Sequence, residues 1–331
     1  MLLTVCAGIV SFIVRDRTIA FALLTYIPLL PVGLATIVLD IVTRGRPWSR
    51  PQYLASAIGI GAAAMGGFPL LGSAPANTTL GPDSRVIHVL HWNVMWGGGP
   101  GLSPRTWASQ RSTILANKPD IVMLSESPQL LWIDQLLEQL GPEWTLARAG
   151  NEPRDAYWYQ LTILARGTVR IERTVPFPNG VGLDVSVKIG DQSLRVLAVD
   201  GRSNPLQSRL PLLKTLSRYC EGEAELGRPV DIIGGDFNTP SRSLGFDALS
   251  EQGFRLASRS TSGWRGTFPS YLPVYDIDHV WVAKKNWRVH SCDLFNGPYS
   301  DHRGQLVNIV PEADPRPSII KSSASAARAT R

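Results

Sequence analysis

Three long apolar runs occupy most of the first 72 positions of this chain, and shorter apolar runs follow them. The long runs extend from Leu2 to Val14, from Thr18 to Val42 and from Tyr53 to Gly72. The second and third reach the roughly 20 residues that a helix needs to cross a bilayer, whereas the first is short. Residues 1–72 are therefore predicted to form a membrane anchor of two to three transmembrane helices.

Two other interpretations of this region compete with a membrane anchor. A cleaved signal peptide would have a basic first segment and no further hydrophobic runs, but Met1 to Val14 contains no Lys or Arg. A buried helical subdomain of a soluble protein stays open as the second alternative. The small residues of "GIGAAAMGG" (59–67) would allow close helix packing and a homo-oligomer formed through the anchor.

The arginines between the runs predict the orientation. Arg44, Arg46 and Arg50 follow the second run, while Arg15 and Arg17 follow the first and are offset by an acid. The segment richer in arginine is expected on the cytoplasmic side, so a third span would deliver the remaining chain to the other side. The domain after residue 72 is thus predicted to be extracytoplasmic.

The rest of the chain is predicted to be a mixed α/β (α+β) domain covering residues 85–310. Residues 73–84 read as a linker and residues 311–331 as a disordered tail. Short runs rich in strand formers predict strands at 85–94, 120–126, 160–166, 183–189, 193–200, 230–237, 278–284 and 304–310. Helical patterns cover 103–116, 129–140, 206–225 and 243–252. Many strands and few helices predict packed sheets whose outer faces are covered by helices.

Composition changes this picture little. Of 33 Lys/Arg and 27 Asp/Glu, residues 73–310 hold 24 and 23, so the domain is almost neutral although the whole chain carries a formal charge of +6. This balance gives the domain no overall basic footprint for nucleic acid. The three cysteines provide no disulfide framework, and Cys220 and Cys292 are expected to be buried thiols.

Polar side chains recur where strands end or begin. Asn93 and Glu126 end the first two predicted strands, and "DIIGGDFNTP" (231–240) ends in Asp236 and Asn238. If that segment stays extended, the side chains of Asp236 and Asn238 point to the same side and share a ligand, and Gly234 and Gly235 leave room for that ligand. The alternative is that Asp236 and Asn238 form an Asx turn. The remaining candidates, Asp278, Asp301 and His302, precede the last two predicted strands.

In the order N, E, GDFN, D, SDH, these motifs resemble those of the endonuclease/exonuclease/phosphatase superfamily, which is DNase I-like, and "GTFPSYLPVYDIDHVWV" (266–282) is similar to its membrane-anchored bacterial members. The resemblance covers residues 85–310 and implies a four-layer α/β/β/α sandwich. It also implies a bacterial inner-membrane location. His279, His88, His91 and His290 match no motif position and are expected to be packed or surface residues.

The resemblance also implies roles. Glu126, Asn93, Asp236 and Asp301 would hold Mg²⁺ or Mn²⁺, which prefer oxygen ligands. His302, oriented by Asp278, would handle the proton of an attacking water, while Asn238 would orient that water or contact the phosphate.

One position departs from the pattern, because Asp200 stands where many relatives carry His or Asn. A carboxylate there would repel phosphate unless it binds a metal, carries a proton or pairs with nearby Arg202. Asp200 and Arg202 are therefore candidate substrate-binding residues.

These expectations describe a membrane-tethered, metal-dependent phosphoesterase that acts on a phosphate ester, either a nucleic acid or a phospholipid or inositol phosphate. A catalytically idle member that binds a partner is the alternative from another class.

Overall fold

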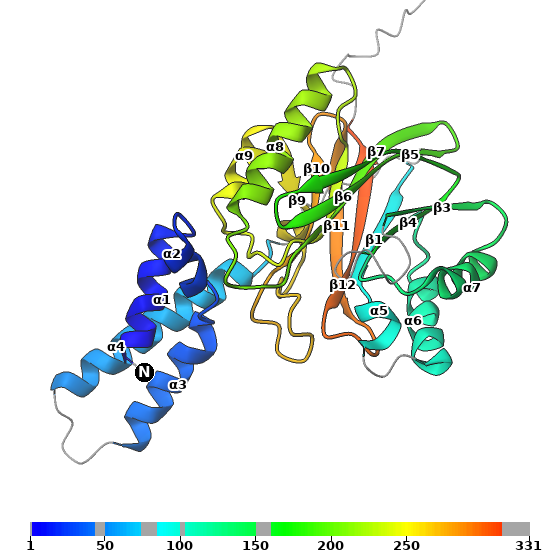
Figure 1. The fold of residues 1–331 in the computed structure, drawn as a ribbon. Coiled ribbons are helices and arrows are strands. Elements are labelled where there is room, and N and C mark those ends of the chain that lie inside the picture. The colour runs from blue at the N-terminus through cyan, green and yellow to red at the C-terminus, as the bar shows by residue number, and fades with distance from the viewer. Residues whose placement is uncertain (1, 44–49, 74–84, 100–102, 150–159, 313–331) are drawn as a thin grey trace, which may run out of the picture.

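The structure, a computed structural model, describes residues 2–43, 50–73, 85–99, 103–149 and 160–312. Within them, a helical arm formed by the N-terminal residues leans against a sandwich of two sheets (Figure 1). Each sheet has six strands.

The first sheet has the strand order β11-β12-β1-β2-β4-β3. Its strands are β1 (Ile87–Asn93), β2 (Ile121–Ser125), β3 (Trp144–Ala149), β4 (Leu161–Arg166), β11 (Trp287–Asn296) and β12 (Arg303–Pro311). Strands β1 and β2 are parallel, whereas β12 runs antiparallel to β1. The carboxyl ends of β1 and β2 and the start of β12 therefore lie at the same end of the sheet.

The second sheet repeats this arrangement, with the order β5-β6-β7-β8-β10-β9. Its strands are β5 (Thr168–Phe177), β6 (Gly180–Ile189), β7 (Gln192–Gly201), β8 (Ile232–Asp236), β9 (Phe254–Leu256) and β10 (Asp278–Ala283). Strands β7 and β8 are parallel, and β10 is antiparallel to β8. The ends of β7 and β8 thus meet the start of β10.

Three apolar cores separate four layers. One core lies between the two sheets and includes Val89, Met123 and Val280. A second joins the outer face of the second sheet to the helices α8 (Leu210–Glu225) and α9 (Gly245–Glu251). A third joins the first sheet to α6 (Pro104–Ala116) and α7 (Leu130–Leu140). The predicted layered architecture is confirmed, because every sheet face is covered either by the other sheet or by helices (Figure 1).

The helical arm differs from the predicted anchor in its second run. Its helices are α1 (Leu2–Val14), α2 (Ile19–Leu24), α3 (Leu29–Val42) and α4 (Arg50–Gly67), and a 3₁₀ turn (Phe68–Leu70) follows α4. The domain also contains the short helix α5 (Met95–Gly98) and a 3₁₀ turn (Ala257–Ser260). The run predicted as one helix over 18–42 is divided between α2 and α3 near Pro28, which has no amide hydrogen to continue a helix. At about 1.5 Å per residue, the 14 residues of α3 reach only about 21 Å, less than the roughly 30 Å of a bilayer core.

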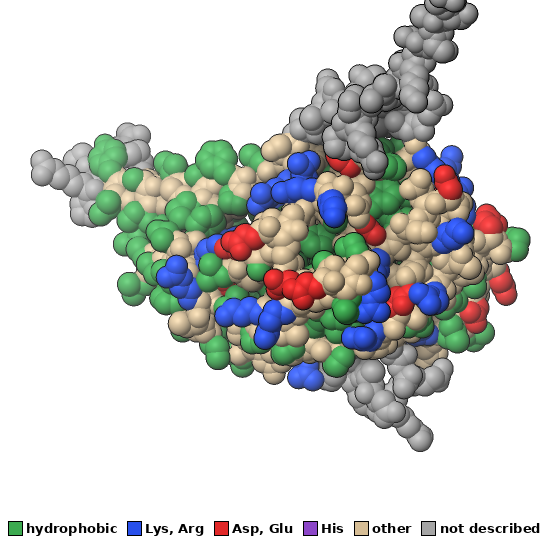
Figure 2. Space-filling model, turned by 90° about the horizontal axis from the view of Figure 1, so that it is seen from above, with side chains coloured by type: hydrophobic (Ala, Val, Ile, Leu, Met, Phe, Trp, Pro, Cys, Tyr) green, Lys and Arg blue, Asp and Glu red, His purple; other side chains and the backbone are tan. Residues whose placement is uncertain are grey.

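One helix in the described part of the chain, Tyr53–Leu70, is long and apolar enough to cross a membrane. Many large apolar side chains of the arm face outward, among them Ile13, Val38, Ile60 and Phe68. In Figure 2, hydrophobic side chains cover much of the visible surface of the arm.

The small residues of α4 serve contacts within the chain. A Cβ on Gly66 would lie 2.4 Å from the backbone nitrogen of Leu30, and one on Gly33 would lie 2.5 Å from that of Ala63. Helices α3 and α4 therefore pack backbone to backbone, as small residues permit. The expected homo-oligomer remains a prediction, but these glycines already have partners in the same chain.

The two domain cysteines are free and buried in different cores. Cys220 lies in the core beneath α8, and Cys292 lies in the core between the sheets. They cannot pair, and the prediction of buried thiols is confirmed.

Candidate active site

The predicted polar residues gather at one end of the sandwich because of the strand directions. Asn93 ends β1 and Glu126 follows β2, while Asp236 ends β8 and Asp278 begins β10. Asp278 lies opposite Asp236 in the sheet register, and Asp200 lies beside Asp236 on its other side. Residues that are far apart in sequence, and that belong to two sheets, thus meet at one end of the sandwich.

His302 and Asp278 form a buried pair. The imidazole Nδ1 lies 2.8 Å from Asp278 Oδ2, and both side chains are almost fully buried. Burial by itself lowers the pKa of His302, but the charges of Asp278 and Asp236 outweigh it and raise this pKa to about 10. Asp278 therefore fixes the ring with Nδ1–H toward the carboxylate, and Nε2 is left for chemistry.

Nε2 of His302 faces two further carboxylates. It lies 3.8 Å from Asp236 Oδ2 and 3.9 Å from Asp301 Oδ1. The side chain of Asp301 is 41% exposed, in contrast to the buried Asp236. Nε2 is thus directed at two of the predicted metal ligands.

Asn93 joins the two sheets across the site. Its Nδ2 donates to Asp236 Oδ2 at 3.0 Å, and its Oδ1 accepts from the backbone N–H of Met95 at 2.9 Å. Asn93 also lies close enough to Glu126 to lower the pKa of that carboxyl, against the larger effect of burial. Asn93, Glu126 and Asp236 therefore lie together in one group.

Asn238 reaches the site by a route that differs from the prediction. Strand β8 ends at Asp236, and Asn238 has a left-handed φ of 48°, so the two side chains do not follow strand alternation. Asp236 Oδ1 accepts the backbone N–H of Asn238 at 2.8 Å, which is the Asx turn considered as the alternative. The Nδ2 of Asn238 donates to the Gly201 carbonyl at 2.8 Å and fixes the amide beside β7.

The two glycines before Asp236 do not make room for a ligand, contrary to the prediction. A Cβ on Gly235 would lie 1.7 Å from the carbonyl oxygen of Val199, and one on Gly234 would lie 2.3 Å from the Met123 side chain. They allow β8 to pack against β7 and against the opposite sheet.

A cavity of about 460 Å³ opens beside these residues. It is lined by Trp96, Glu126, Asp200, Gly201, Arg202, Ser203, Asn204 and Asn238. Asp200 is buried, and its Oδ2 has no hydrogen-bond partner among the described residues. Burial, Asp236 and Glu126 together raise the pKa of Asp200 well above its ordinary value. Arg202 is the cation of this lining. Asp200 and Arg202 thus line the same cavity, and their role as substrate contacts remains a prediction.

The donor set fits a divalent cation. Burial first, and then Asp278, raise the pKa of Asp236 to about 7, and burial raises that of Glu126. Neighbouring carboxylates repel one another when they are ionised, and a bound cation offsets this repulsion. Oxygen donors are the ligands that suit Mg²⁺ or Mn²⁺. Asp236, Asp278 and His302 offer atoms within 4.8 Å of one another, but Asp278 and His302 already bind each other. Glu126, Asn93 and Asp236 are the better candidate ligands, with Asp301 beside them.

Several supporting residues had no signal in the sequence. Thr267 Oγ1 accepts from the backbone N–H of Asp278, and Gln305 Nε2 donates to the Asp278 carbonyl at 2.7 Å. Ser300 Oγ donates to the Asn93 carbonyl at 2.7 Å, and the ring of Phe268 lies 5.0 Å from that of His302. Their spacing follows no local pattern, because each is brought in by tertiary packing.

The other histidines have the expected packed roles where the structure shows their contacts. His279 lies among aromatic rings, with Nε2 2.8 Å from the Thr239 carbonyl. Nδ1 of His88 lies 2.6 Å from Asn308 Oδ1, and Nε2 of His91 lies 3.2 Å from Ser125 Oγ.

Comparison with solved structures shows the same fold in other proteins. An endonuclease/exonuclease/phosphatase family protein from Bacteroides thetaiotaomicron matches with a TM-score of 0.52 and 18% identity, over 70% of this chain and 99% of its own. The human Nocturnin catalytic domain with bound sulfate anion gives 0.51 and 16%, over 69% and 98%. D. rerio TDP2 complexed with single strand DNA product gives 0.53 and 17%, over 68% and 98%.

No curated protein matches the chain in sequence. The model of the Endonuclease/Exonuclease/phosphatase family matches residues 90–302, a segment that begins within β1 and ends at the candidate catalytic histidine. The chain belongs to the Endonuclease/Exonuclease/phosphatase family.

Proposed function

We propose that this protein is a Mg²⁺- or Mn²⁺-dependent phosphoesterase that hydrolyses a phosphate ester with a water molecule, and that its N-terminal helices attach it to a membrane. The observation that carries the proposal is the buried Asp278–His302 pair, whose free Nε2 faces the group formed by Asn93, Glu126 and Asp236. This group adjoins a cavity that contains Arg202. A proton acceptor, a cation site and a place for an anion are thus combined.

The residues divide the work as follows. In its neutral form, His302 Nε2 takes the proton of the attacking water, and Asp278 stabilises the resulting imidazolium through Nδ1–H. A cation held by Asp236 would favour this neutral form, because the charges of Asp278 and Asp236 otherwise raise the pKa of His302 to about 10. Asn238, fixed by Gly201 and Asp236, presents its amide to the cavity and orients the phosphate or the water. Arg202 offsets the charge of the phosphate oxygens. When bound by Glu126, Asn93 and Asp236, the cation supplies charge neutralisation.

Two of the similar solved structures support a phosphate ester as the ligand of this site. Human Nocturnin was solved with a sulfate anion, and D. rerio TDP2 with a single strand DNA product. On this fold, then, both a small oxyanion and a nucleic acid have been bound. The near-neutral domain leaves a nucleic acid and a phospholipid or inositol phosphate as competing substrates for this chain.

Membrane attachment is supported by the apolar outer surface of the arm and by the helix Tyr53–Leu70. Helix α3 runs away from the sandwich and α4 returns to it, so the first turn of α4 lies far from the domain (Figure 1). Arg15 belongs to the other arginine-containing connection, which competes with Arg44–Arg50 for the cytoplasmic side, and it is bound to Asp247 of the domain. We therefore propose an inner-membrane protein of a bacterium, with the domain on the extracytoplasmic side.

The test is hydrolysis by the full chain in detergent or nanodiscs. The panel contains bis-p-nitrophenyl phosphate, single-stranded and duplex DNA, RNA, inositol phosphates and phospholipid vesicles, each with Mg²⁺, with Mn²⁺ and with EDTA. We expect turnover that needs a divalent cation and is lost in both Glu126→Ala and His302→Ala. A folded, cation-binding protein without turnover on the panel would contradict the proposal and favour the catalytically idle alternative. Steep inhibition by salt would indicate nucleic acid as substrate.

A further inference from the structure

The turn between α2 and α3 contacts the loop that carries a candidate catalytic residue. Tyr26, in this turn, donates its hydroxyl hydrogen to the Asn238 carbonyl at 2.6 Å. Asn238 is held by two other bonds, to Asp236 and to Gly201, which come from within the sandwich. The bond from Tyr26 is the one among these three that comes from the helical arm, and it acts where the backbone takes its left-handed turn.

Tyr26 also touches the segment beside His302. Its carbonyl accepts the hydroxyl hydrogen of Tyr275 at 2.6 Å, and the two rings lie 6.4 Å apart. Tyr275 in turn pairs through its backbone with Phe268, whose ring packs on His302. One residue of the arm therefore contacts two site segments that are separated by almost 40 positions of the chain.

Polar contacts from the connection between α1 and α2 also hold the arm against the domain. Arg15 makes two hydrogen bonds to the Asp247 carboxylate, at 2.7 and 2.8 Å, and donates to the Ser243 carbonyl at 2.8 Å. Asp16 accepts from the hydroxyl of Ser243 and from the backbone N–H of Leu244. These contacts fall on the same segment, 238–247, that continues from Asn238.

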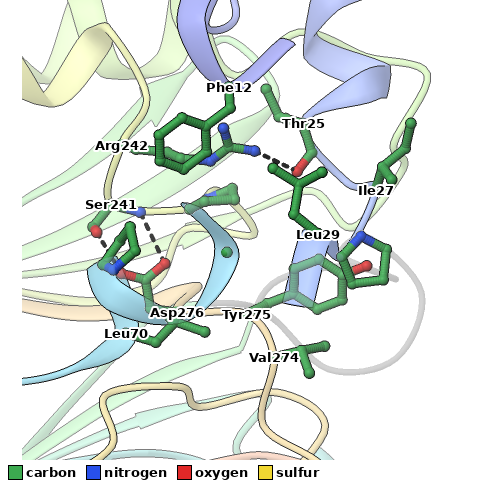
Figure 3. A pocket seen from close by; sticks show the side chains of 14 residues that line it. Phe12, Thr25, Ile27, Leu29, Leu70, Ser241, Arg242, Val274, Tyr275 and Asp276 are labelled. Atoms are coloured by element: carbon green, nitrogen blue, oxygen red, sulfur yellow. Dashed lines mark hydrogen bonds between the residues drawn. The ribbon is translucent and has the colours of Figure 1, made fainter. Parts of the chain in front are cut away.

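The close-up in Figure 3 shows a third link, from the guanidinium of Arg242 to the Thr25 carbonyl at 2.9 Å. The same guanidinium lies 4.7 Å from the centre of the Phe12 ring. The arm thus contacts the loop after Asn238 at its beginning, middle and end. A hydrophobic anchor on a free linker would need no such set of charged and hydrogen-bonded contacts.

We propose that Tyr26 is a positioning residue for the active site, and that the segment Arg15–Tyr26 of the arm is a structural part of that site. The arm holds the backbone at Asn238 so that its amide faces the cavity. The effect on turnover rests on the proposed function, in which Asn238 acts on the phosphate or the water. A chain without residues 1–72 keeps the metal ligands but loses this support.

The experiment compares the full chain with Tyr26→Phe and with the matched control Tyr219→Phe. Tyr219 also donates its hydroxyl hydrogen to a protein oxygen, on Asp184 of β6, but this contact lies beneath α8 and away from the site. Three quantities are measured: hydrolysis of bis-p-nitrophenyl phosphate, backbone hydrogen exchange of residues 237–244, and the unfolding temperature. Loss of one hydrogen bond at Asn238 is expected to lower kcat about 3- to 10-fold with KM little changed.

Tyr26→Phe is also expected to increase hydrogen exchange in 237–244 more than elsewhere in the sandwich, whereas Tyr219→Phe leaves both kcat and this exchange unchanged. Arg15→Gln, which removes the contact with Asp247, is a second variant and is expected to loosen the same segment. Unchanged exchange and unchanged kcat in both arm variants would overturn the proposal, as would equal losses in the Tyr219 control. If the wild-type chain hydrolyses nothing, the proposed function fails, and exchange at 237–244 still decides whether the arm positions Asn238.

Discussion

Replacing Asp278 with Asn should remove the charge that orients and stabilises the His302 imidazolium while keeping the shape of the side chain. The Nδ1 to Oδ2 distance is 2.8 Å, and both groups are buried. A hydrogen bond to a charged partner contributes about 1.5–3 kcal/mol. Since about 1.4 kcal/mol corresponds to a factor of ten in rate, kcat is expected to fall by about 10- to 150-fold.

The assay is steady-state hydrolysis of bis-p-nitrophenyl phosphate by the full chain at saturating Mn²⁺, with kcat and KM determined separately. KM should change little, because Asp278 supports His302 and does not line the cavity. Calorimetry of Mn²⁺ binding serves as the second readout, and the affinity should change less than kcat because Glu126 and Asn93 are intact.

The control is Asp184→Asn, which removes another fully buried carboxylate, here paired with Arg195 at 2.6 Å. Both variants should lower the unfolding temperature, because each removes a carboxylate from a buried cationic partner, although Arg195 keeps its second ion pair, with Glu223, and His302 keeps Asp236 nearby. Only Asp278→Asn should lower kcat. A kcat within twofold of wild type for Asp278→Asn, or equal losses in both variants, would refute the role of the pair in catalysis.

Three further outcomes are expected. Gly235→Ala should fail to fold or lose most of its stability, because the added Cβ would meet the Val199 carbonyl oxygen at 1.7 Å; circular dichroism and the expression yield of folded protein report this, and a folded, stable variant would contradict the packing of β8 on β7. Burial raises the pKa values of Cys220 and Cys292 to about 12, so thiolate is scarce at pH 8 and these thiols should react with iodoacetamide only as pH rises toward 12 or after unfolding, as mass spectrometry of labelled peptides can show; rapid labelling of the native domain at pH 8 would be inconsistent with their burial. Asp200→Asn removes a buried carboxylate that has no hydrogen-bond partner at Oδ2, so the cation-free variant should be as stable as wild type or more stable. Differential scanning fluorimetry should show that Mn²⁺ raises the unfolding temperature of the variant less than that of wild type. An unchanged Mn²⁺ effect would show that Asp200 does not interact with the cation.

Much of the candidate site could be found from sequence because its residues stand at strand ends. Asn93, Glu126, Asp236 and Asp278 are adjacent to strong apolar runs, and the directions of parallel and antiparallel strands bring such ends together. The role of the glycines could not be found in the same way. Gly235 is required by a backbone atom of β7, a neighbour that no local pattern reveals.

Tyr26 shows the same limit more strongly. In the sequence it is an aromatic residue inside a hydrophobic run, and nothing in its position marks it as a partner of the domain. Its hydroxyl meets Asn238 across 212 positions of the chain, and only the docking of the arm brings the two together.

The sequence by itself determined the eight central strands, the four outer helices and the order of the polar residues, because buried elements must be apolar with a regular period. The four strands it missed, β3, β5, β9 and β11, are the edge strands of the two sheets. An edge strand is paired on one side and partly exposed, so its pattern is weak, and β5 and β11 are further interrupted by irregular register near Glu172 and His290. The division of the second apolar run at Pro28 is a local effect of the proline, which hydropathy alone does not register. Hydropathy records that these residues avoid water, but the glycine contacts and the docking of the arm depend on the atoms that meet them in space.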